Sequence, residues 1–479
     1  MSATSPQTLT PDICVIGGGP GGLSVAAAAA GFGVPTVLIE RHRMGGDSLT
    51  SGSVPSKALL AAARRAEAIR SADAFGLDAQ NVAVNFVKVR DHVHGVVAAI
   101  APADSAERFT GLGVRIIHAD AKFSGRQSVT AGDIEVRARR FVIATGSAPT
   151  IPAIPGLDSG PYLTSESVFD LKERPEHLII IGAGSTGLEM AQAFRRLGSS
   201  VTVLDGATPL AHDDPECAAI VLDRLEREGV IIRSGVKVIG IAHARGTVTA
   251  TIETADAEQT ITGSHLLIAT GRRPMIDSLD LDAAGIRRDR TGIIVNGKLK
   301  TSNRRVYAIG DCAAGHSPLA HAASYHASLV IRNALFRHPV RVDNSAIQWA
   351  TFTEPELAHT GLTEAQAHAR RINIRVTRWP YNDNDRAQAE RETRGHIKVI
   401  TTSKGRIVGV TIVGAQAGEL IAMWTLAIAQ GLNIRALAGL VLPYPTLSEL
   451  GKRAAIDFFT PGLTSTRVRR IIGWMRMFG

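Results

Sequence analysis

A repeated strand–turn–helix–strand unit constrains the fold of this chain more than any other feature of its sequence. An apolar strand at 12–18 ends in glycines, an alanine-rich helix follows from Pro20 to Ala30, and the strand Thr36–Glu40 ends on an acid. The same order returns at 178–182, 185–197 and 201–205. In each copy 23 positions separate the first glycine from the acid, Gly17 from Glu40 and Gly182 from Asp205. This alternation predicts an α/β fold with parallel strands.

The glycines of each copy follow the pattern Gly-x-Gly-x-x-Gly, between a strand and the start of a helix. The two sets are Gly17, Gly19 and Gly22, and Gly182, Gly184 and Gly187. Such glycines permit a tight turn, close approach of backbone to a pyrophosphate, and close helix packing. Amides at the helix start stabilise phosphates, and Glu40 or Asp205 would accept hydrogen bonds from a ribose. We therefore predict two dinucleotide-binding sites.

The residues around Asp205 favour NADH over NADPH. An acid at this point would repel a 2′-phosphate, and Gly206, Ala207 and Thr208 supply no arginine to hold one. Two dinucleotide sites imply electron transfer between cofactors, and a nicotinamide exchanges hydride more readily with a flavin than with another nicotinamide. The glycines alone do not say which site would hold the flavin.

The 479 residues suffice for about three domains. Each repeat has a later strand, at 140–146 and 265–271, and a third strand at 305–310 leads into Asp311 and a helix at 319–336. Strand pairs at 227–262 predict hairpins. From Trp349 the pattern becomes α+β, without a glycine fingerprint. Its predicted strands are 374–379, 395–400 and 407–413, and its predicted helices are 363–371, 415–431 and 446–458.

Composition excludes several classes of function. The three cysteines, Cys14, Cys217 and Cys312, are too widely spaced for a disulfide framework or a zinc site, which fits a reducing, cytoplasmic compartment. We see no signal peptide and no apolar run of 18 residues. The net charge is +9, but no nucleic-acid-binding motif accompanies it, so nucleic acid is excluded as a partner. His326 and His359 lack metal-ligand spacing, and we predict no metal site.

Taken together, these motifs resemble the pyridine nucleotide–disulfide oxidoreductases, from Asp12 to about Ala455. The resemblance implies FAD on the first fingerprint and NAD(P) on the second. It also implies that Thr145-Gly146, Gly271 and Gly310 match cofactor-binding turns, that Asp311 binds the ribityl chain of FAD, and that His321 lies near the flavin ring. The implied domains are 1–150 and 272–345 for FAD, 151–271 for NAD, 346–462 for dimerisation, and a basic tail at 463–479.

The redox segment departs from that family at its reactive positions. The frame from Gly45-Gly46 to Pro55-Ser56-Lys57 is intact, but Ser48 and Ser53 replace both cysteines of the family motif. A hydroxyl forms neither an accessible anion near neutral pH nor a disulfide. Gly46, Ser48 and Ser53 are therefore expected beside the cofactor without a dithiol.

The family's acid–base pair, contributed by the partner subunit of a homodimer, departs as well. The segment here is Tyr444-Pro445-Thr446-Leu447-Ser448-Glu449, so Glu449 remains and Tyr444 replaces histidine. A tyrosine is a poor base at neutral pH but can donate a hydrogen bond. Thr50 also departs from the family's asparagine, and these independent changes favour natural divergence over engineered serines. The resemblance further implies that Lys57 lies near the flavin and pairs with Glu189, either as a structural ion pair or to stabilise charge on the reduced flavin.

The predicted function is that of an FAD-dependent enzyme that takes hydride from NADH and passes electrons directly to a quinone or another diffusible oxidant. One alternative is a flavin-binding subunit with little turnover. Another is a disulfide reductase of dihydrolipoamide dehydrogenase type that uses some other thiol. The acceptor is not identified by any residue.

The last residues, 464–479, combine arginines with bulky apolar side chains at helical spacing. Such a helix suits the surface of an anionic membrane, which would be a peripheral contact. The alternative is that its apolar face packs on the dimerisation domain, and the sequence favours that alternative slightly.

Overall fold

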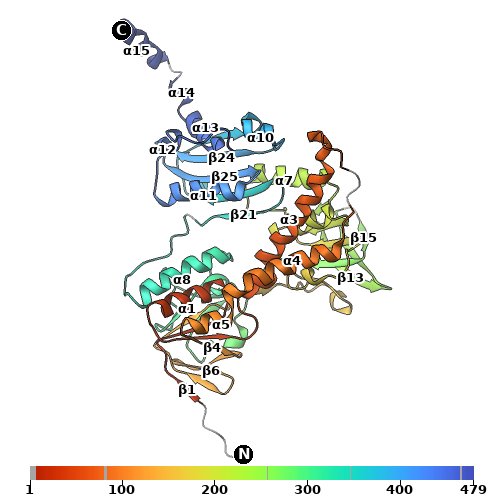
Figure 1. Cartoon of the computed structure of the whole chain (residues 1–479), viewed down its shortest axis with the longest axis vertical. Coiled ribbons are helices and arrows are strands. Elements are labelled where there is room, and N and C mark those ends of the chain that lie inside the picture. The colour runs from red at the N-terminus through yellow and green to blue at the C-terminus, as the bar shows by residue number, and fades with distance from the viewer. Residues whose placement is uncertain (1–6, 80–82, 256, 346, 464–465, 479) are drawn as a thin grey trace, which may run out of the picture. The chain divides into compact units, whose positions relative to one another are not determined.

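The computed structural model describes residues 7–79, 83–255, 257–345, 347–463 and 466–478 (Figure 1). The chain divides into two compact units. The first consists of Met1–Gly182, Arg196–Ser200 and Val238–Val342, and the second of Ala183–Arg195, Val201–Lys237 and Asp343–Gly479. No helix among the described residues combines the length and apolar character needed to cross a bilayer.

The first unit is built on a five-stranded sheet in the order β20-β8-β2-β3-β4, with parallel pairing throughout. The strands are β2 (Ile13–Ile16), β3 (Thr36–Glu40), β4 (Val114–His118), β8 (Arg140–Ile143) and β20 (Val306–Ala308). Helices α1 (Pro20–Gly31) and α8 (Ala320–Ala334) lie side by side against this sheet (Figure 1). The first predicted repeat is confirmed, because β2, α1 and β3 occupy its ranges within a few residues.

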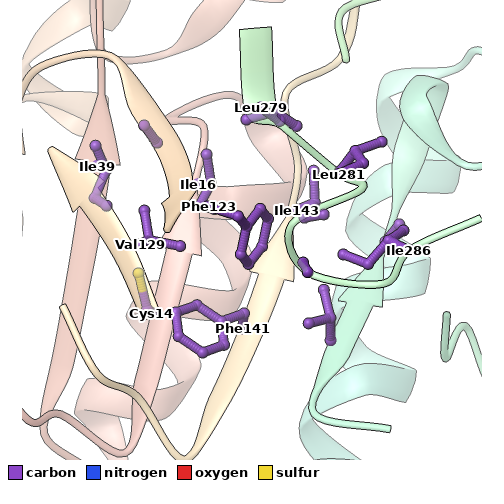
Figure 2. Packing of buried hydrophobic residues seen from close by; sticks show 14 of the residues in the cluster. Cys14, Ile16, Ile39, Phe123, Val129, Phe141, Ile143, Leu279, Leu281 and Ile286 are labelled. Carbon is purple, nitrogen blue, oxygen red and sulfur yellow. The ribbon is translucent and has the colours of Figure 1, made fainter. Parts of the chain in front are cut away.

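One core cluster of the first unit lies between α1, α8 and the five-stranded sheet, and another lies between that sheet and a smaller one, ordered β1-β7-β6-β5. Its strands are β1 (Gln7–Leu9), β5 (Ala121–Gly125), β6 (Ser128–Ala131) and β7 (Ile134–Val136). The rings of Phe123 and Phe141 meet edge to face at 5.7 Å between centroids. Figure 2 shows Cys14 and Val129 beside them. Cys14 is fully buried there, which confirms its predicted place in the core.

The remaining elements of this unit include helices and strands that the sequence patterns did not reveal. Helices are α2 (Gly46–Thr50), α3 (Ser53–Arg70), α4 (Phe86–Ile100) and α5 (Ala106–Gly111). Strands are β9 (Ser147–Pro149), β10 (His177–Ile181), β13 (Lys237–Ala244), β14 (Thr247–Glu253), β15 (Glu258–Gly263), β16 (His265–Ile268), β17 (Arg272–Pro274), β18 (Arg288–Asp289) and β19 (Gly292–Ile293). β10 pairs with β16 in parallel, and β14 with β15 antiparallel.

The predicted hairpin region at 227–262 is only partly correct. β14 and β15 form a hairpin, but in the second unit β12 (Ile231–Ser234) pairs in parallel with β11 (Ser200–Asp205). The physical reason is that helix α7 (Pro215–Arg227) connects β11 to β12 as a crossover, which places the two strands in the same direction.

The second unit also contains an antiparallel sheet in the order β21-β22-β25-β24-β23. Its strands are β21 (Trp349–Thr351), β22 (Glu356–Gly361), β23 (Ile374–Pro380), β24 (His396–Thr402) and β25 (Ile407–Gly414). Helices α11 (Ala417–Ala429) and α13 (Glu449–Asp457) pack on this sheet, with Trp424 and Leu450 buried in the core. The helices of the unit are α6 (Ser185–Arg196), α7, α9 (Glu364–Ala369), α10 (Asp385–Ala389), α11 (Ala417–Ala429), α12 (Ile434–Ala438), α13 (Glu449–Asp457), α14 (Thr460–Leu463) and α15 (Thr466–Met475). The predicted α+β pattern after Trp349 is confirmed.

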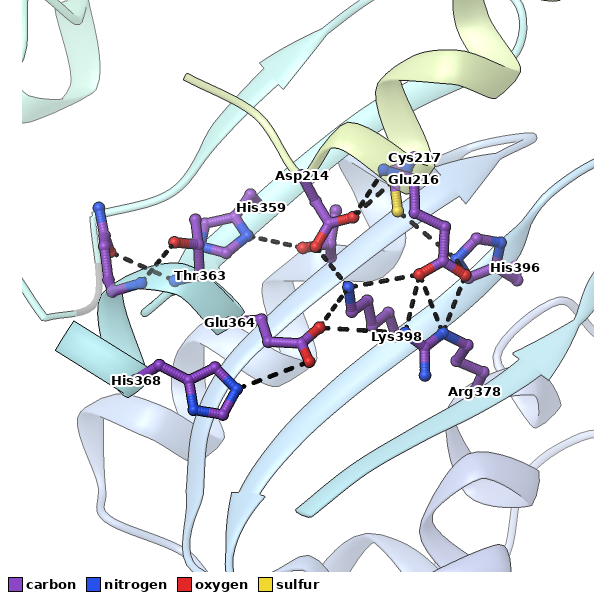
Figure 3. Close-up of polar contacts among 12 residues, drawn as sticks. Asp214, Glu216, Cys217, His359, Thr363, Glu364, His368, Arg378, His396 and Lys398 are labelled. Atoms are coloured by element: carbon purple, nitrogen blue, oxygen red, sulfur yellow. Dashed lines mark hydrogen bonds and ion pairs between the residues drawn. The ribbon is translucent and has the colours of Figure 1, made fainter. Parts of the chain in front are cut away.

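A buried ion cluster joins α7 to this sheet (Figure 3). The Lys398 ammonium on β24 lies 2.6 Å from Asp214 and 2.7 Å from Glu364, and the side chains of Lys398 and Asp214 are 4% and 3% exposed. Asp214 also caps α7 by accepting from the Glu216 amide at 3.1 Å. Burial opposes the charge on Lys398, but its hydrogen bonds to Asp214 and Glu364 outweigh burial and raise its pKa. Replacing only one member of this cluster destabilises the fold strongly, because another charge is left buried without its partner.

Candidate functional site

The first fingerprint forms a turn that only glycine can occupy. Gly17 has a φ of +108°, and a Cβ there would overlap the carbonyl of Ala144 at the end of β8. A Cβ at Gly22 would overlap the carbonyl of Gly17. Gly19 is the N-cap of α1, and no side chain caps the helix amides. The uncapped helix start and the close-packed glycines fit the pyrophosphate of a dinucleotide such as FAD.

Glu40 holds this turn through both of its carboxylate oxygens. Oε2 accepts from the Gly18 amide at 2.5 Å, and Oε1 accepts from the His42 amide at 2.7 Å. The second fingerprint repeats the arrangement, since Asp205 accepts from the Ala183 amide at 2.5 Å and from the Ala207 amide at 2.7 Å. The internal repeat therefore extends from chain order to individual hydrogen bonds. Recognition of a ribose by either acid stays a prediction.

The redox segment packs directly on the first fingerprint. The Gly45 amide donates to the Gly18 carbonyl at 2.9 Å. Gly46 has a φ of +63°, and a Cβ there would lie 2.8 Å from the Cα of Gly19. No larger residue than glycine fits this approach, which explains the Gly45-Gly46 pair and places the segment at the predicted cofactor site.

Ser48 and Ser53 lie on either side of a tight turn between α2 and α3. A Cβ on Gly52, the chain neighbour of Ser53, would lie 3.6 Å from the Cα of Ser48. Ser48 is half-buried and Ser53 is exposed. Lys57 follows one turn further along α3 and is half-buried. The backbone at Gly52 thus lies against Ser48, and Ser53 is the next residue along the chain.

A polar chain that the sequence did not reveal links this segment to Asp311. The Ser147 hydroxyl donates to Asp311 at 2.6 Å, and Arg272 Nε donates to the Ser147 hydroxyl at 2.7 Å. Arg272 also pairs with Asp47, which stands between Gly46 and Ser48. Burial raises the pKa of Asp311, while its bond to Ser147 acts in the opposite direction. The sequence offered one signal for these two residues, which is their place next to predicted turns. Ser147 directly follows Thr145-Gly146, and Arg272 directly follows Gly271.

The turns after the sheet strands occupy the expected positions. Thr145-Gly146 follows β8, and Gly310 begins the turn that carries Asp311. Gly146 and Gly310 both have a φ of +66°. His321 is exposed at the start of α8, whereas His326 on the same helix is fully buried. His326 Nδ1 accepts from the Gly310 amide at 3.3 Å, so this histidine supports the turn.

The second fingerprint has the same backbone constraint as the first. Gly182 has a φ of +112°, and a Cβ there would overlap the carbonyl of Ala269. Gly184 and Gly271 face open space where a Cβ would stand, Gly271 with a φ of +106°. Gly187 is buried on α6. These features fit a second dinucleotide.

Glu189 on α6 is 4% exposed, and its Oε1 accepts from the Phe352 amide at 2.9 Å. It therefore has a structural role within the second unit, whereas Lys57 belongs to the first unit. The predicted pairing of Lys57 with Glu189 beside a flavin stays a prediction.

Tyr444 and Glu449 lie on the C-terminal domain as predicted. The Tyr444 side chain is exposed, and its hydroxyl donates to Asp385 at 2.6 Å. This hydrogen bond raises the pKa of Tyr444 above its usual value. Glu449 is half-buried and begins α13. Their approach to Ser48 and Ser53 of a partner subunit stays a prediction.

The three cysteines are free and buried. Burial raises the pKa of all three thiols, that of Cys312 to about 11. Cys14 lies in β2, Cys217 in the first turn of α7, and Cys312 in the turn after Asp311, so their predicted structural roles agree with their burial. Among the described residues, no cluster of three or more histidines, cysteines or acids could hold a metal ion.

Comparison with known proteins gives matches along nearly the whole chain. The family model described as pyridine nucleotide-disulphide oxidoreductase matches residues 11–327, and the model of its dimerisation domain matches residues 347–455. The mercuric reductase of Streptomyces lividans is 35% identical over 458 residues, covering 93% of this chain and 96% of that protein. The dihydrolipoyl dehydrogenase of Bacillus subtilis (strain 168) is 34% identical over 454 residues, covering 93% and 95%.

Solved structures agree with this result. The Cu(II) complex of the HOCl-induced flavoprotein disulfide reductase RclA from Escherichia coli has a TM-score of 0.84 at 25% identity, covering 94% of this chain and 99% of that chain. LpdA from Mycobacterium tuberculosis has a TM-score of 0.85 at 26% identity, with the same coverage. Members of the family are NAD(P)H-dependent flavoprotein oxidoreductases. The resemblance inferred from the motifs is confirmed, and the chain belongs to the pyridine nucleotide–disulphide oxidoreductase family, including its C-terminal dimerisation domain.

Proposed function

We propose that this protein is an FAD-dependent oxidoreductase that takes hydride from NADH and passes electrons directly to a non-disulfide acceptor such as a quinone. The observation that carries the proposal is Ser48 and Ser53 in the redox segment, which packs against the first fingerprint through Gly45 and Gly46. Bound FAD would accept hydride from NADH and give up electrons to a second acceptor. The hydroxyls cannot relay these electrons as a disulfide would.

The chain's own residues would supply binding, orientation and charge. Gly17, Gly19 and Gly22 and the start of α1 would hold the FAD pyrophosphate, and Asp311 would meet its ribityl chain. The arginine of the Asp47–Arg272–Ser147 chain orients the hydroxyl that bonds Asp311. Lys57 would stabilise negative charge near the reduced flavin. Gly182, Gly184, Gly187 and Asp205 would hold NADH.

The competing function is a disulfide reductase that uses another thiol. The names of the relatives suit it equally well, because RclA is a flavoprotein disulfide reductase. Against it stand the burial and raised pKa values of Cys14, Cys217 and Cys312, since a buried thiol forms little thiolate at neutral pH. A flavin-binding subunit with negligible turnover is the other alternative, and the retained Lys57, Glu189 and Asp205 count against it.

The test is steady-state oxidation of NADH by the purified flavoprotein with a panel of acceptors. We expect turnover with a quinone and none above background with lipoamide or glutathione disulfide. Brisk reduction of either disulfide would support the competing function instead. If NADH does not bleach the flavin under anaerobic conditions, the protein is a flavin-binding subunit with negligible turnover.

A further inference from the structure

The C-terminal helix α15 carries a bulky apolar face that its own chain leaves exposed. At helical spacing Ile471, Ile472, Trp474, Met475 and Phe478 fall on one side, and three of the four arginines, Arg469, Arg470 and Arg476, fall on the other. The exposed fractions of the apolar side chains are large: Ile471 55%, Ile472 51%, Trp474 60%, Met475 60% and Phe478 73%. The expectation that this face packs on the dimerisation domain of the same chain is therefore wrong for the described residues 466–478, and Thr464, Ser465 and Gly479 lie outside them.

The hydrogen bonds of α15 continue to the C-terminal end of its apolar face. The amides of Arg476, Met477 and Phe478 donate to carbonyls three or four residues earlier, which continues the turn beyond Met475. The rings of Trp474 and Phe478 meet edge to face at 5.0 Å between centroids. The C-terminal end of the apolar face therefore carries two aromatic rings in contact with each other.

The charge of this segment has one sign. Residues 458–479 contain four arginines and no aspartate or glutamate, in a chain whose net charge is +9. A second copy of the helix placed on this face would bring like charges together, whereas an anionic lipid surface would neutralise them. A helix of ten residues spans only about 15 Å, which suits a position in the plane of the interface. Aromatic side chains are favoured at the boundary of headgroups and acyl chains.

We propose that α15 is a membrane-surface anchor that binds anionic lipid bilayers, with its apolar face in the acyl boundary and its arginines among the headgroups. This inference does not depend on the identity of the electron acceptor. If the acceptor is a lipid-dissolved quinone, the anchor would bring the flavin site to the phase that holds it.

The test is co-sedimentation of the full-length flavoprotein with vesicles of phosphatidylcholine alone or mixed with phosphatidylglycerol. We expect binding to the anionic vesicles at least about tenfold tighter than to the neutral ones, and weakening with salt. Ile471→Asp with Ile472→Asp removes the apolar contact, and Arg469→Glu with Arg470→Glu reverses the charge. Each double variant should lower vesicle binding by about tenfold or more while keeping its flavin spectrum.

The matched control is Val441→Asp, which changes an apolar side chain that is 95% exposed outside α15. It should bind anionic vesicles as the parent protein does. Trp474 gives a direct signal, because it is 60% exposed and its emission should shift to shorter wavelength on vesicles. Equal binding to neutral and anionic vesicles, or binding unchanged in both double variants, would overturn the proposal. So would a change of oligomeric state in the Ile471 and Ile472 variant without vesicles, since α15 would then cover a second copy of the chain.

Discussion

The Tyr444 hydroxyl donates a hydrogen bond to the Asp385 carboxylate at 2.6 Å. This bond and the negative charge of Asp385 raise the pKa of Tyr444, so the phenol stays protonated through the neutral range. A residue that keeps its proton cannot serve as a base. Tyr444 is therefore a hydrogen-bond donor to Asp385 near neutral pH, and not a proton acceptor.

We expect Tyr444→Phe to lower turnover with a quinone by no more than about fivefold, the effect of one hydrogen bond. The pH dependence of kcat between pH 6 and 9 should not change, because Tyr444 does not titrate there. The measurement is a pair of pH profiles for the parent and the variant. A basic limb near neutral pH that disappears in the variant would show that Tyr444 acts as a base after all.

Replacement of both serines by cysteine tests whether the frame still supports a dithiol. Because Gly52 brings Ser53 close to Ser48, we expect Ser48→Cys with Ser53→Cys to form a disulfide that accepts a second electron pair. Anaerobic titration should then consume about two NADH per flavin. The Ser53→Cys single variant is the control and should titrate as the parent does. An unchanged titration in the double variant would mean that the two positions are not aligned with the flavin.

Asp205 should govern the choice of nicotinamide. Asp205→Asn keeps an oxygen that can accept one backbone hydrogen bond but removes the charge, so we expect KM for NADH to rise about tenfold and the preference over NADPH to shrink. Glu40→Gln, the matched change in the first fingerprint, should reduce flavin content and leave the KM ratio unaltered. If the parent protein already prefers NADPH, the assignment of Asp205 fails.

The Lys398 cluster should contribute strongly to stability. Lys398→Met leaves Asp214 buried without its partner, and we expect a loss of about 3–5 kcal/mol in the free energy of unfolding. Adding Asp214→Asn should restore part of it. The control is Arg227→Met, which breaks an exposed pair with Asp223 and should cost less than about 1 kcal/mol. Denaturant unfolding measures the stability of all three variants. Equal losses of unfolding free energy in Lys398→Met and Arg227→Met would contradict a stabilising role of the buried cluster.

Stability should fall as pH drops from about 6.5 to 4. Burial lowers the pKa of His359 and of His326 to about 4, with His316 acting in the same direction on His326. In that window the unfolded state binds protons that the folded state does not, so acid favours unfolding, by roughly 3 kcal/mol per histidine. His359→Gln should flatten the dependence of the thermal midpoint on pH, whereas exposed His92→Gln should not. A midpoint independent of pH across this window would refute the assignment.

Local sequence patterns predicted the repeat, the fingerprints and the α+β domain, because glycine turns and strand ends depend on neighbouring residues. Helices α3 and α4 were missed, and β12 was expected in a hairpin although it pairs in parallel with β11. Contacts between residues far apart in the sequence were not predicted either, because they leave no local sequence pattern. Lys398 meets Asp214 across 184 positions, and Arg272 meets Ser147 across 125. Such pairs depend on how elements pack rather than on spacing along the chain.

The most direct measurement for the central claim is an anaerobic titration of the parent flavoprotein with NADH, followed by addition of single acceptors. The proposed function predicts that about one NADH per flavin completes the bleaching, because the hydroxyls of Ser48 and Ser53 accept no electron pair. The reduced protein should be reoxidised by a quinone and remain reduced with lipoamide or glutathione disulfide. Consumption of a second NADH per flavin, or prompt reoxidation by either disulfide, would contradict the account.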